Sequence, residues 1–164
     1  MNLNIFEEPK KNLENVNWKL YVDGAARNNP GPAGAGIYLV KDDKPILKKG
    51  FFLGNRTNNQ AEYLALLLGI FFIRQNLSEG ESIQIISDSE LLVKQFNGDY
   101  LIKNLELKKM YDCAKIFLKS YKYSFQHILR ENNAVADKLA NEGINKKIPV
   151  PNEFLSMWCL NEEG

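Results

Sequence analysis

Residues 18–32 read Trp18-Lys-Leu-Tyr-Val-Asp-Gly-Ala-Ala-Arg-Asn-Asn-Pro-Gly-Pro32, and this stretch sets the fold. Its first six residues are rich in apolar and β-forming side chains, which is typical of a buried strand. The glycine, asparagine and proline cluster that follows indicates a turn. Two further β-forming runs, 36–40 and 45–52, are separated by Asp42-Asp43, a pair that indicates a turn. Connections this short favour an antiparallel meander of three strands.

Helix and strand patterns alternate through the rest of the chain. The run at 59–75 is apolar nearly all round, so it predicts a helix that is buried on most of its faces. After it we expect a strand at 82–87, a brief helix at 90–95, a long helix at 105–120, a strand at 123–129 and a last helix from 132 or 133 to about 143. Because crossovers between parallel strands are right-handed, strands 4 and 5 should lie beside strand 1 and parallel to it. The predicted fold is α/β, with a mixed five-stranded sheet in the order 3-2-1-4-5, an antiparallel strand 2 and helices on both faces.

Length and composition are those of an ordinary soluble globular protein. The 164 residues are 45% hydrophobic and 25% charged, which suits about one domain. Lys and Arg number 21 and Asp and Glu 20, so any binding to nucleic acid must depend on local charge. The longest apolar run, 63–73, is shorter than the ~20 residues of a membrane-spanning helix. Two cysteines and one histidine are too few for a Cys/His zinc site.

The sequence predicts a single domain at 18–145, between a polar extension at 1–17 and a tail at 146–164. Pro149 and Pro151 favour an extended tail. The first 20 residues lack the apolar segment of a signal peptide. Cys113 and Cys159 lie far apart in the sequence and indicate isolated thiols in a reducing compartment. We therefore expect a cytoplasmic protein.

Four acidic residues fall where this layout brings distant parts of the chain together. Asp23 ends the central strand and Asp88 follows the neighbouring fourth strand, so the two should emerge side by side. Glu62, in an apolar helix, and Asp137, one turn into the last helix, can approach the same sheet edge. Each alone also suits a turn, a helix cap or a favourable helix dipole. Converging carboxylates cannot all stay ionised without a cation, so the joint pattern predicts Mg²⁺ or Mn²⁺ and two-metal phosphoryl transfer.

The segments that carry these acids are distinctive as a set. They read Tyr21-Val-Asp-Gly-Ala-Ala-Arg-Asn-Asn-Pro-Gly-Pro-Ala-Gly-Ala-Gly36, Thr57-Asn-Asn-Gln-Ala-Glu-Tyr63, Ile85-Ile-Ser-Asp-Ser89 and Arg130-Glu-Asn-Asn-Ala-Val-Ala-Asp-Lys-Leu-Ala140. In this order they resemble the type 1 ribonuclease H family, and the resemblance covers about residues 18–143. It implies a ribonuclease H-like fold with the sheet order given above.

The resemblance also implies an activity and a set of site residues. It implies an endoribonuclease that hydrolyses the RNA strand of RNA–DNA hybrids with two Mg²⁺ ions, or Mn²⁺, and leaves 3′-hydroxyl and 5′-phosphate ends. The catalytic metal ligands would be Asp23, Glu62, Asp88 and Asp137. The residues that contact the hybrid would be Asn29, Thr57, Asn58 and Asn59. Thr57 matches the family residue that holds a phosphate of the DNA strand, although these polar residues equally suit caps and turns.

Two residues are candidates for an assisting role. His127 lies ten residues before Asp137, which matches the spacing of a mobile-loop histidine in many family members. Here it falls inside the predicted strand at 123–129, which favours a strand histidine. Arg130 resembles the arginine of the short-loop members and is the better candidate for an assisting cation, with a plain surface arginine as the other interpretation.

Residues 95–104 are too short for the basic helical protrusion that grips the hybrid in some members, so the chain resembles the branch without it. The stretch 101–122 carries six lysines and two acidic residues, for a local charge of +4. This charge can bind phosphates, or it can belong to a solvated helix face. Without the protrusion we expect weaker hybrid binding and stronger salt sensitivity.

Two other functions fit the same scaffold: a catalytically weak or inactive module that binds hybrids, and another nuclease of the superfamily, such as a resolvase or transposase core. The segment at 57–62 argues against the second of these. We expect a monomer that binds an RNA–DNA hybrid, with no obligate protein partner and no contact with a membrane.

Overall fold

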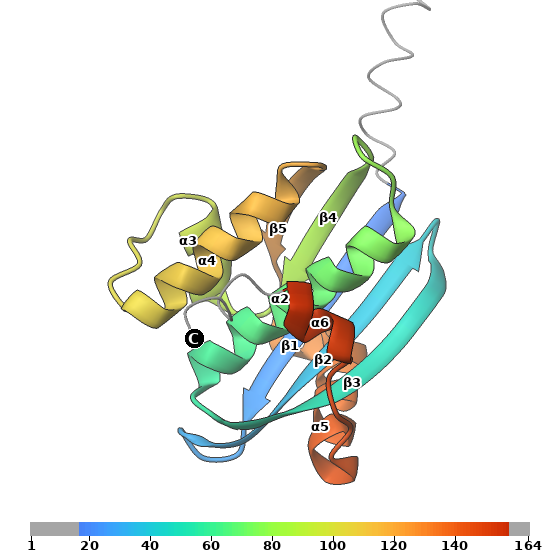
Figure 1. Ribbon diagram of the computed structural model, residues 1–164. Helices are drawn as coiled ribbons and strands as arrows, with labels where there is room; N and C mark the ends of the chain where they lie inside the picture. The colour runs from blue at the N-terminus through green and yellow to red at the C-terminus, as the bar shows by residue number, and fades with distance from the viewer. Residues whose placement is uncertain (1–16, 158–164) are drawn as a thin grey trace, which may run out of the picture.

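A five-stranded sheet in the order β3-β2-β1-β4-β5 runs through the computed structural model, which describes residues 17–157 (Figure 1). The strands are β1 (Trp18–Ala26), β2 (Gly31–Lys41), β3 (Lys44–Arg56), β4 (Ser82–Ser87) and β5 (Lys122–His127). The helices are α2 (Asn58–Asn76), α3 (Glu90–Phe96), α4 (Leu105–Leu118), α5 (Ala134–Lys146) and α6 (Asn152–Met157), with a 3-10 turn, η1 (Arg130–Asn132), before α5. The predicted sheet order and the antiparallel strand 2 are confirmed.

Strand pairing decides which residues reach the end of β1 together. β1 pairs antiparallel with β2, and Asp23 lies opposite Gly36. β1 pairs parallel with β4 up to the pair of Val22 and Ser87. Asp88 is therefore the first residue past this pairing, next to Asp23 on the neighbouring strand.

Helices cover both faces of the sheet (Figure 1). α2 lies on the face that carries Val22, because a side chain at Gly69 of α2 would touch Val22. Asp23 follows Val22 on β1, and consecutive residues of a strand point to opposite sides of the sheet, so Asp23 belongs to the other face. Gly36, which lies opposite Asp23 on β2, belongs to the same face as Asp23. A side chain at Gly36 would strike Ala136, so α5 packs on this second face.

α2 is the buried helix that its sequence predicts. Its residues from Ala61 to Ile73 are buried apart from Glu62. A capping box begins the helix: the Gln60 N–H donates to Thr57 Oγ1 (3.1 Å), and the Thr57 N–H donates to Gln60 Oε1 (2.9 Å). These reciprocal bonds satisfy amides that a helix start otherwise leaves without partners, and they fix where α2 begins relative to the sheet.

The expectation of an extended tail is wrong for residues 152–157, which form α6. Phe154 explains the difference. Its side chain is 1% exposed and its ring meets the Phe71 ring of α2 edge-to-face, with centroids 6.0 Å apart. Burial of an aromatic ring against α2 stabilises α6. Pro151 fits this arrangement because proline is tolerated at helix starts.

Two predicted boundaries near the site also differ. β5 ends at His127 and not at Leu129, because the chain then enters η1. α5 continues to Lys146, past Gly143, near which its sequence pattern predicts the end. A Cβ at Gly143 would lie 2.5 Å from backbone atoms of Phe51, so this glycine permits close packing of α5 on β3 and is not a helix stop.

The expectation of isolated thiols is also wrong, because Cys113, buried in α4, is disulfide-bonded. Pairing depends on where folding places the sulfur atoms, which sequence separation does not reveal. The inference of a reducing compartment from these thiols therefore loses its support.

Among residues 17–157, no helix has both the length and the apolar character needed to cross a membrane. The predicted extension, apart from Asn17, and the tail past Met157 lie outside the described residues.

Candidate metal centre

Three carboxylates from distant parts of the chain meet at the end of β1. Asp23, Glu62 and Asp88 each offer one oxygen atom, and these atoms all lie within 4.8 Å of one another. Asp23 is 4% exposed, and the other two residues are half-buried. The cluster offers only oxygen ligands, which is the donor set that Mg²⁺ and Mn²⁺ prefer.

Sheet pairing and one hydrogen bond hold these side chains. Asp23 and Asp88 stand at the same end of the adjacent parallel strands β1 and β4. Glu62, in the second turn of α2, accepts a hydrogen bond from the Gly24 N–H to its Oε1 (3.0 Å). Ser89, and not Asp88, caps α3 through its side-chain oxygen. The Asp88 carboxylate is therefore not consumed by helix capping.

Asp137 lies beside the cluster. It is half-buried in the first turn of α5, and its side chain hydrogen-bonds with that of Asp23. Such a bond requires a proton on one of the two carboxyls, because ionised carboxylates only accept. The structure thus gathers three of the four predicted acids into one group and places the fourth against Asp23.

Burial and repulsion raise the pKa of two of these carboxyls. Burial is the main cause at Asp23, and the three neighbouring acids add to it, which raises the pKa of Asp23 to about 9. Burial and the charge of Asp88 raise the pKa of Glu62 to about 8, while the Gly24 amide and the Arg130 guanidinium act in the opposite direction. A divalent cation would relieve this repulsion, so the charges and the ligand atoms both fit such an ion.

These shifts predict how the stability of the metal-free protein depends on pH. The unfolded chain releases the two protons near pH 4, whereas the folded protein keeps them until about pH 8 to 9. The unfolded state thus binds fewer protons in this window, so the free energy of unfolding falls as pH rises, by at most about 1.4 kcal/mol per pH unit for each group. Urea unfolding in chelator at pH 5, 6, 7 and 8 measures the slope.

Asp23→Asn is the matched control for this pH series, because it removes one of the two titrating groups and keeps the side-chain size. The parent minus variant difference should decrease as pH rises from 5 to 8. A difference that stays constant, or that increases, would contradict the raised pKa of Asp23.

Arg130 and His127 lie at the two ends of the short connection between β5 and η1. Arg130, in η1, is exposed, and its guanidinium lowers the pKa of Glu62, which places its charge near the acids. His127 is exposed at the last position of β5, paired with Ser87. The position of His127 in a strand agrees with its sequence pattern, and Arg130 is the candidate whose charge acts on an acid of the cluster.

The polar residues predicted to bind substrate gather at the start of α2. The Asn58 N–H donates to Asn29 Oδ1 (2.9 Å), and the Ala26 N–H donates to Asn58 Oδ1 (3.2 Å). Asn29, Thr57 and Asn59 line a cavity of about 320 Å³ together with Gln60, Asn104 and Leu107. Thr57 and Asn29 therefore both accept from an amide at the start of α2 and face a cavity, so for these two the interpretations left open by the sequence are compatible.

One buried polar residue beside the acids was missed at the sequence level. Asn133 is 2% exposed, and its Nδ2 donates to Asp88 Oδ2 (3.2 Å). Its sequence position predicts only the start of a helix, because asparagine is a common N-cap. No pattern in a single sequence separates a capping asparagine from one that contacts a carboxylate on another element.

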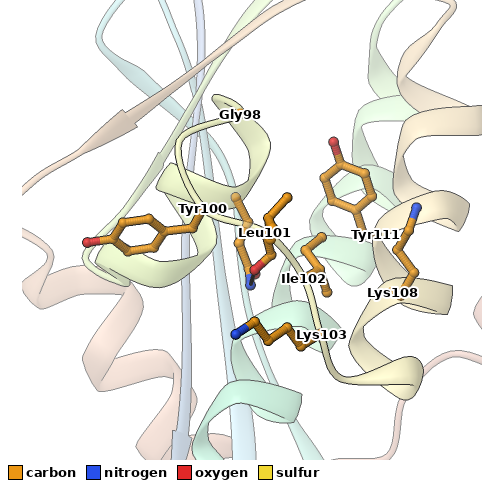
Figure 2. Close-up of a pocket in the computed structure, with 8 residues that line it drawn as sticks. Gly98, Tyr100, Leu101, Ile102, Lys103, Lys108 and Tyr111 are labelled. Carbon is orange, nitrogen blue, oxygen red and sulfur yellow. Dashed lines mark hydrogen bonds between the residues drawn. The ribbon is translucent and has the colours of Figure 1, made fainter.

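The connection between α3 and α4 has no helix of its own, as predicted for a chain without the protrusion. With the start of α4 it lines a cavity of about 380 Å³. Figure 2 shows Leu101 and Ile102 between Tyr100 and Tyr111, with the Lys103 ammonium nearby. This surface combines apolar, aromatic and cationic groups.

Comparison with known proteins agrees with this geometry. The profile of a family described as reverse transcriptase-like matches residues 21–143. Ribonuclease HI of Halobacterium salinarum is 37% identical over 128 residues, which cover 76% of this chain and 63% of that protein. The bifunctional protein Rv2228c of Mycobacterium tuberculosis is 32% identical over 127 residues, which cover 75% of this chain and 34% of that protein. The chain thus spans less than two thirds of the length of these relatives.

Solved structures share the fold. The crystal structure of RNase H1 from Halobacterium salinarum matches with a TM-score of 0.74 and 34% identity, over 79% of this chain and 98% of that one. LC11-RNase H1, crystallised in complex with an RNA/DNA hybrid, matches with a TM-score of 0.75 and 34% identity, over 79% of this chain and 97% of that one. Together with the sheet order and the family match over residues 21–143, these likenesses show that the chain belongs to the type 1 ribonuclease H family.

Proposed function

We propose that this chain is an endoribonuclease that hydrolyses the RNA strand of RNA–DNA hybrids and leaves 3′-hydroxyl and 5′-phosphate ends. The observation that carries the proposal is the cluster of Asp23, Glu62 and Asp88, with Asp137 against it. Membership of the family supports it, as does a relative solved with an RNA/DNA hybrid. We assign the activity to residues 18–145. Because one chain supplies all four acids, a monomer carries a complete set.

The four acids would hold two Mg²⁺ ions, or Mn²⁺. Such ions supply Lewis-acid activation and charge neutralisation for phosphodiester hydrolysis. The chain contributes a prearranged set of ligands: β1 and β4 fix Asp23 and Asp88, and the Gly24 N–H orients the Glu62 carboxylate. Ligands held on a sheet and a buried helix lose little freedom when an ion binds.

The cavity at the start of α2 would receive the hybrid backbone. Thr57 Oγ1 already accepts a bond from the Gln60 N–H, but its hydroxyl hydrogen can still donate to a phosphate oxygen. The start of a helix also favours phosphate through its dipole. Uncharged amides such as Asn29 and Asn59 can contact sugars and backbone without reading the sequence. This cavity therefore suits a nuclease that selects the type of duplex.

Arg130 would act as the assisting cation at the mouth of the site. Its charge already lowers the pKa of Glu62. An exposed guanidinium can also bind a phosphate oxygen while negative charge increases on that oxygen. His127, exposed at the end of β5, is the second candidate. Comparison of Arg130→Ala with His127→Ala in the cleavage assay below decides between them, with the larger kcat loss expected for Arg130→Ala.

The test is a cleavage assay on end-labelled duplexes of one sequence: an RNA–DNA hybrid, double-stranded RNA and double-stranded DNA, each with Mg²⁺ and with chelator. We expect internal cuts in the RNA strand of the hybrid with Mg²⁺ only. A 5′-phosphate-dependent exonuclease should degrade the downstream product, and a polymerase should extend the upstream one.

Each negative result has a defined meaning. An intact hybrid, together with tight hybrid binding, would identify an inactive binding module. Equal cutting of double-stranded DNA would identify a different nuclease of the superfamily. Cleavage that persists in chelator would contradict the proposed use of the carboxylates.

We also expect hybrid binding to weaken steeply with salt, because the lysines of α4 and of the segment before it can contact phosphates. Lys103 lines the cavity before α4, and Lys109 is exposed on the helix. Each phosphate contact lowers the slope of log affinity against log salt by about 0.9. The measurement is fluorescence anisotropy with labelled hybrid in chelator, from about 50 to 200 mM salt.

Lys103→Ala and Lys109→Ala should each make the slope shallower by about one. The matched control is Lys44→Ala, because Lys44 is exposed beside the turn between β2 and β3, at the end of the sheet opposite to Asp23. Affinity that hardly changes with salt would show that these lysines belong to a solvated helix face and do not contact phosphates.

A further inference from the structure

Asn133 occupies an unusual position among the polar residues of the fold. It immediately precedes α5 and is 2% exposed. An N-cap asparagine normally accepts a bond from an amide of the first helical turn, but the Asn133 side chain makes no such bond. Instead, its Nδ2 donates to the Val22 carbonyl oxygen (3.0 Å) and to Asp88 Oδ2 (3.2 Å). Its side chain therefore joins β1 to the residue that follows β4.

The two acceptors also determine the orientation of this amide. Val22 O and an ionised Asp88 oxygen can only accept, so the NH₂ group must face them. Rotation of the amide would place its oxygen against two other oxygens. In the observed orientation Asn133 Oδ1 is buried and has no hydrogen-bond partner among the described residues. Satisfying Val22 and Asp88 thus takes precedence over satisfying the amide oxygen.

The backbone of Asn133 extends this connection. Its carbonyl oxygen accepts from the Asp137 N–H (3.0 Å), which is the first hydrogen bond of α5. Asn133 therefore touches Asp88 through its side chain, Asp137 through its backbone, and the residue before Asp23 on β1. Asn133 thus contacts two of the four acids directly and approaches a third through the residue next to it.

We propose that Asn133 is a positioning residue that holds the Asp88 carboxylate, and with it the spacing of Asp88 to Asp23 and Asp137, for divalent metal binding. The proposal rests on the proposed function. One Asp88 oxygen accepts from the Asn133 amide, so rotation of the carboxylate away from the cluster breaks a partly buried hydrogen bond. Groups that orient a metal ligand in this way commonly affect metal affinity by about 10- to 100-fold.

The deciding variant is Asn133→Ser. Serine is a favoured N-cap, so it preserves the helix start, but its short side chain cannot reach both Val22 O and Asp88. We expect calorimetric titration with Mn²⁺ to show affinity at least about tenfold weaker than in the parent. The metal-free Tm should fall, because Val22 O loses its buried donor, but by less than in Asn133→Ala. In the cleavage assay, the Mg²⁺ concentration at half-maximal rate should rise and kcat should fall, with KM for the hybrid unchanged. Asn133→Ala should show the same metal defect with a lower Tm.

Asn141→Ala is the matched control, because it removes an amide from the same helix that bonds to Arg27 and to the backbone carbonyl of Asp137, with no carboxylate partner. Its Mn²⁺ affinity should equal that of the parent. Parental Mn²⁺ affinity in Asn133→Ser would overturn the proposal, as would a loss equal to that in Asn141→Ala. Because Mn²⁺ binding is measured without substrate, an inactive parent would refute the proposed function separately. An active parent with unaffected Asn133 variants would refute only the positioning role.

Discussion

Asp88→Asn should reduce hydrolysis of an RNA–DNA hybrid by more than about a thousandfold and leave the protein folded. The asparagine has the size of the aspartate, and its amide oxygen can still accept from Asn133 Nδ2, which lies 3.2 Å from the present carboxylate oxygen. What disappears is one negative charge from the group that also contains Asp23 and Glu62. Single-turnover cleavage with excess enzyme measures the loss.

The same substitution should stabilise the metal-free protein. The charge of Asp88 contributes to the raised pKa of both Asp23 and Glu62, so its removal relieves repulsion in the folded state. In chelator at pH 8 we expect Tm to rise by a few degrees, which corresponds to roughly 1 kcal/mol for a domain of this size.

The opposite directions of these two effects make the test specific. A misfolded variant would lose both activity and Tm. Glu90→Gln is the control, because Glu90 lies two residues away, exposed, in a salt bridge with Lys94 and outside the acidic group. It should change neither property. Parental activity in Asp88→Asn would show that the acidic cluster is not the catalytic centre.

Local sequence patterns predicted most of the strands and their order, because the residues between neighbouring strands favour particular turns. Asp42 and Asp43, expected to form a turn, both have positive φ (52° and 64°), as a tight hairpin between twisted strands requires. Parallel crossovers then place β4 and β5 beside β1. Once the order of strands is fixed, the neighbouring positions of Asp23 and Asp88 follow from it.

Contacts between distant residues explain what the sequence could not show. Gly143 has the pattern of a helix stop, but its role is set by the backbone of Phe51 on another element. Phe154 turns a proline-containing tail into a helix because α2 offers it a buried surface. Asn133 has the pattern of a cap, and only the fold reveals Asp88 as its partner. In each case the decisive neighbour is remote in the sequence.

Gly36→Ala should destabilise the protein by about 3 kcal/mol or more, because overpacking against rigid backbone allows little relaxation. Gly36 lies opposite Asp23 on β2, and α5 crosses directly over it. A Cβ at this position would lie 1.9 Å from the Ala136 carbonyl oxygen and 2.8 Å from the Ala140 nitrogen. Both are atoms of the helix backbone, so the clash can be relieved only by moving α5 away from the sheet. Urea unfolding in chelator measures the loss.

The control separates a steric clash from a general intolerance of alanine. Gly80→Ala is the matched variant: Gly80 has φ +87°, and a Cβ there meets nothing within 4 Å. Its cost should be only the left-handed strain of about 1–2 kcal/mol. If Gly36→Ala costs no more than this, α5 does not pack as closely on β2 as the structure shows. If Gly36→Ala costs more, the folded variant should also bind Mn²⁺ more weakly than the parent. The reason is that α5 carries Asp137, and displacement of α5 moves this carboxylate away from Asp23.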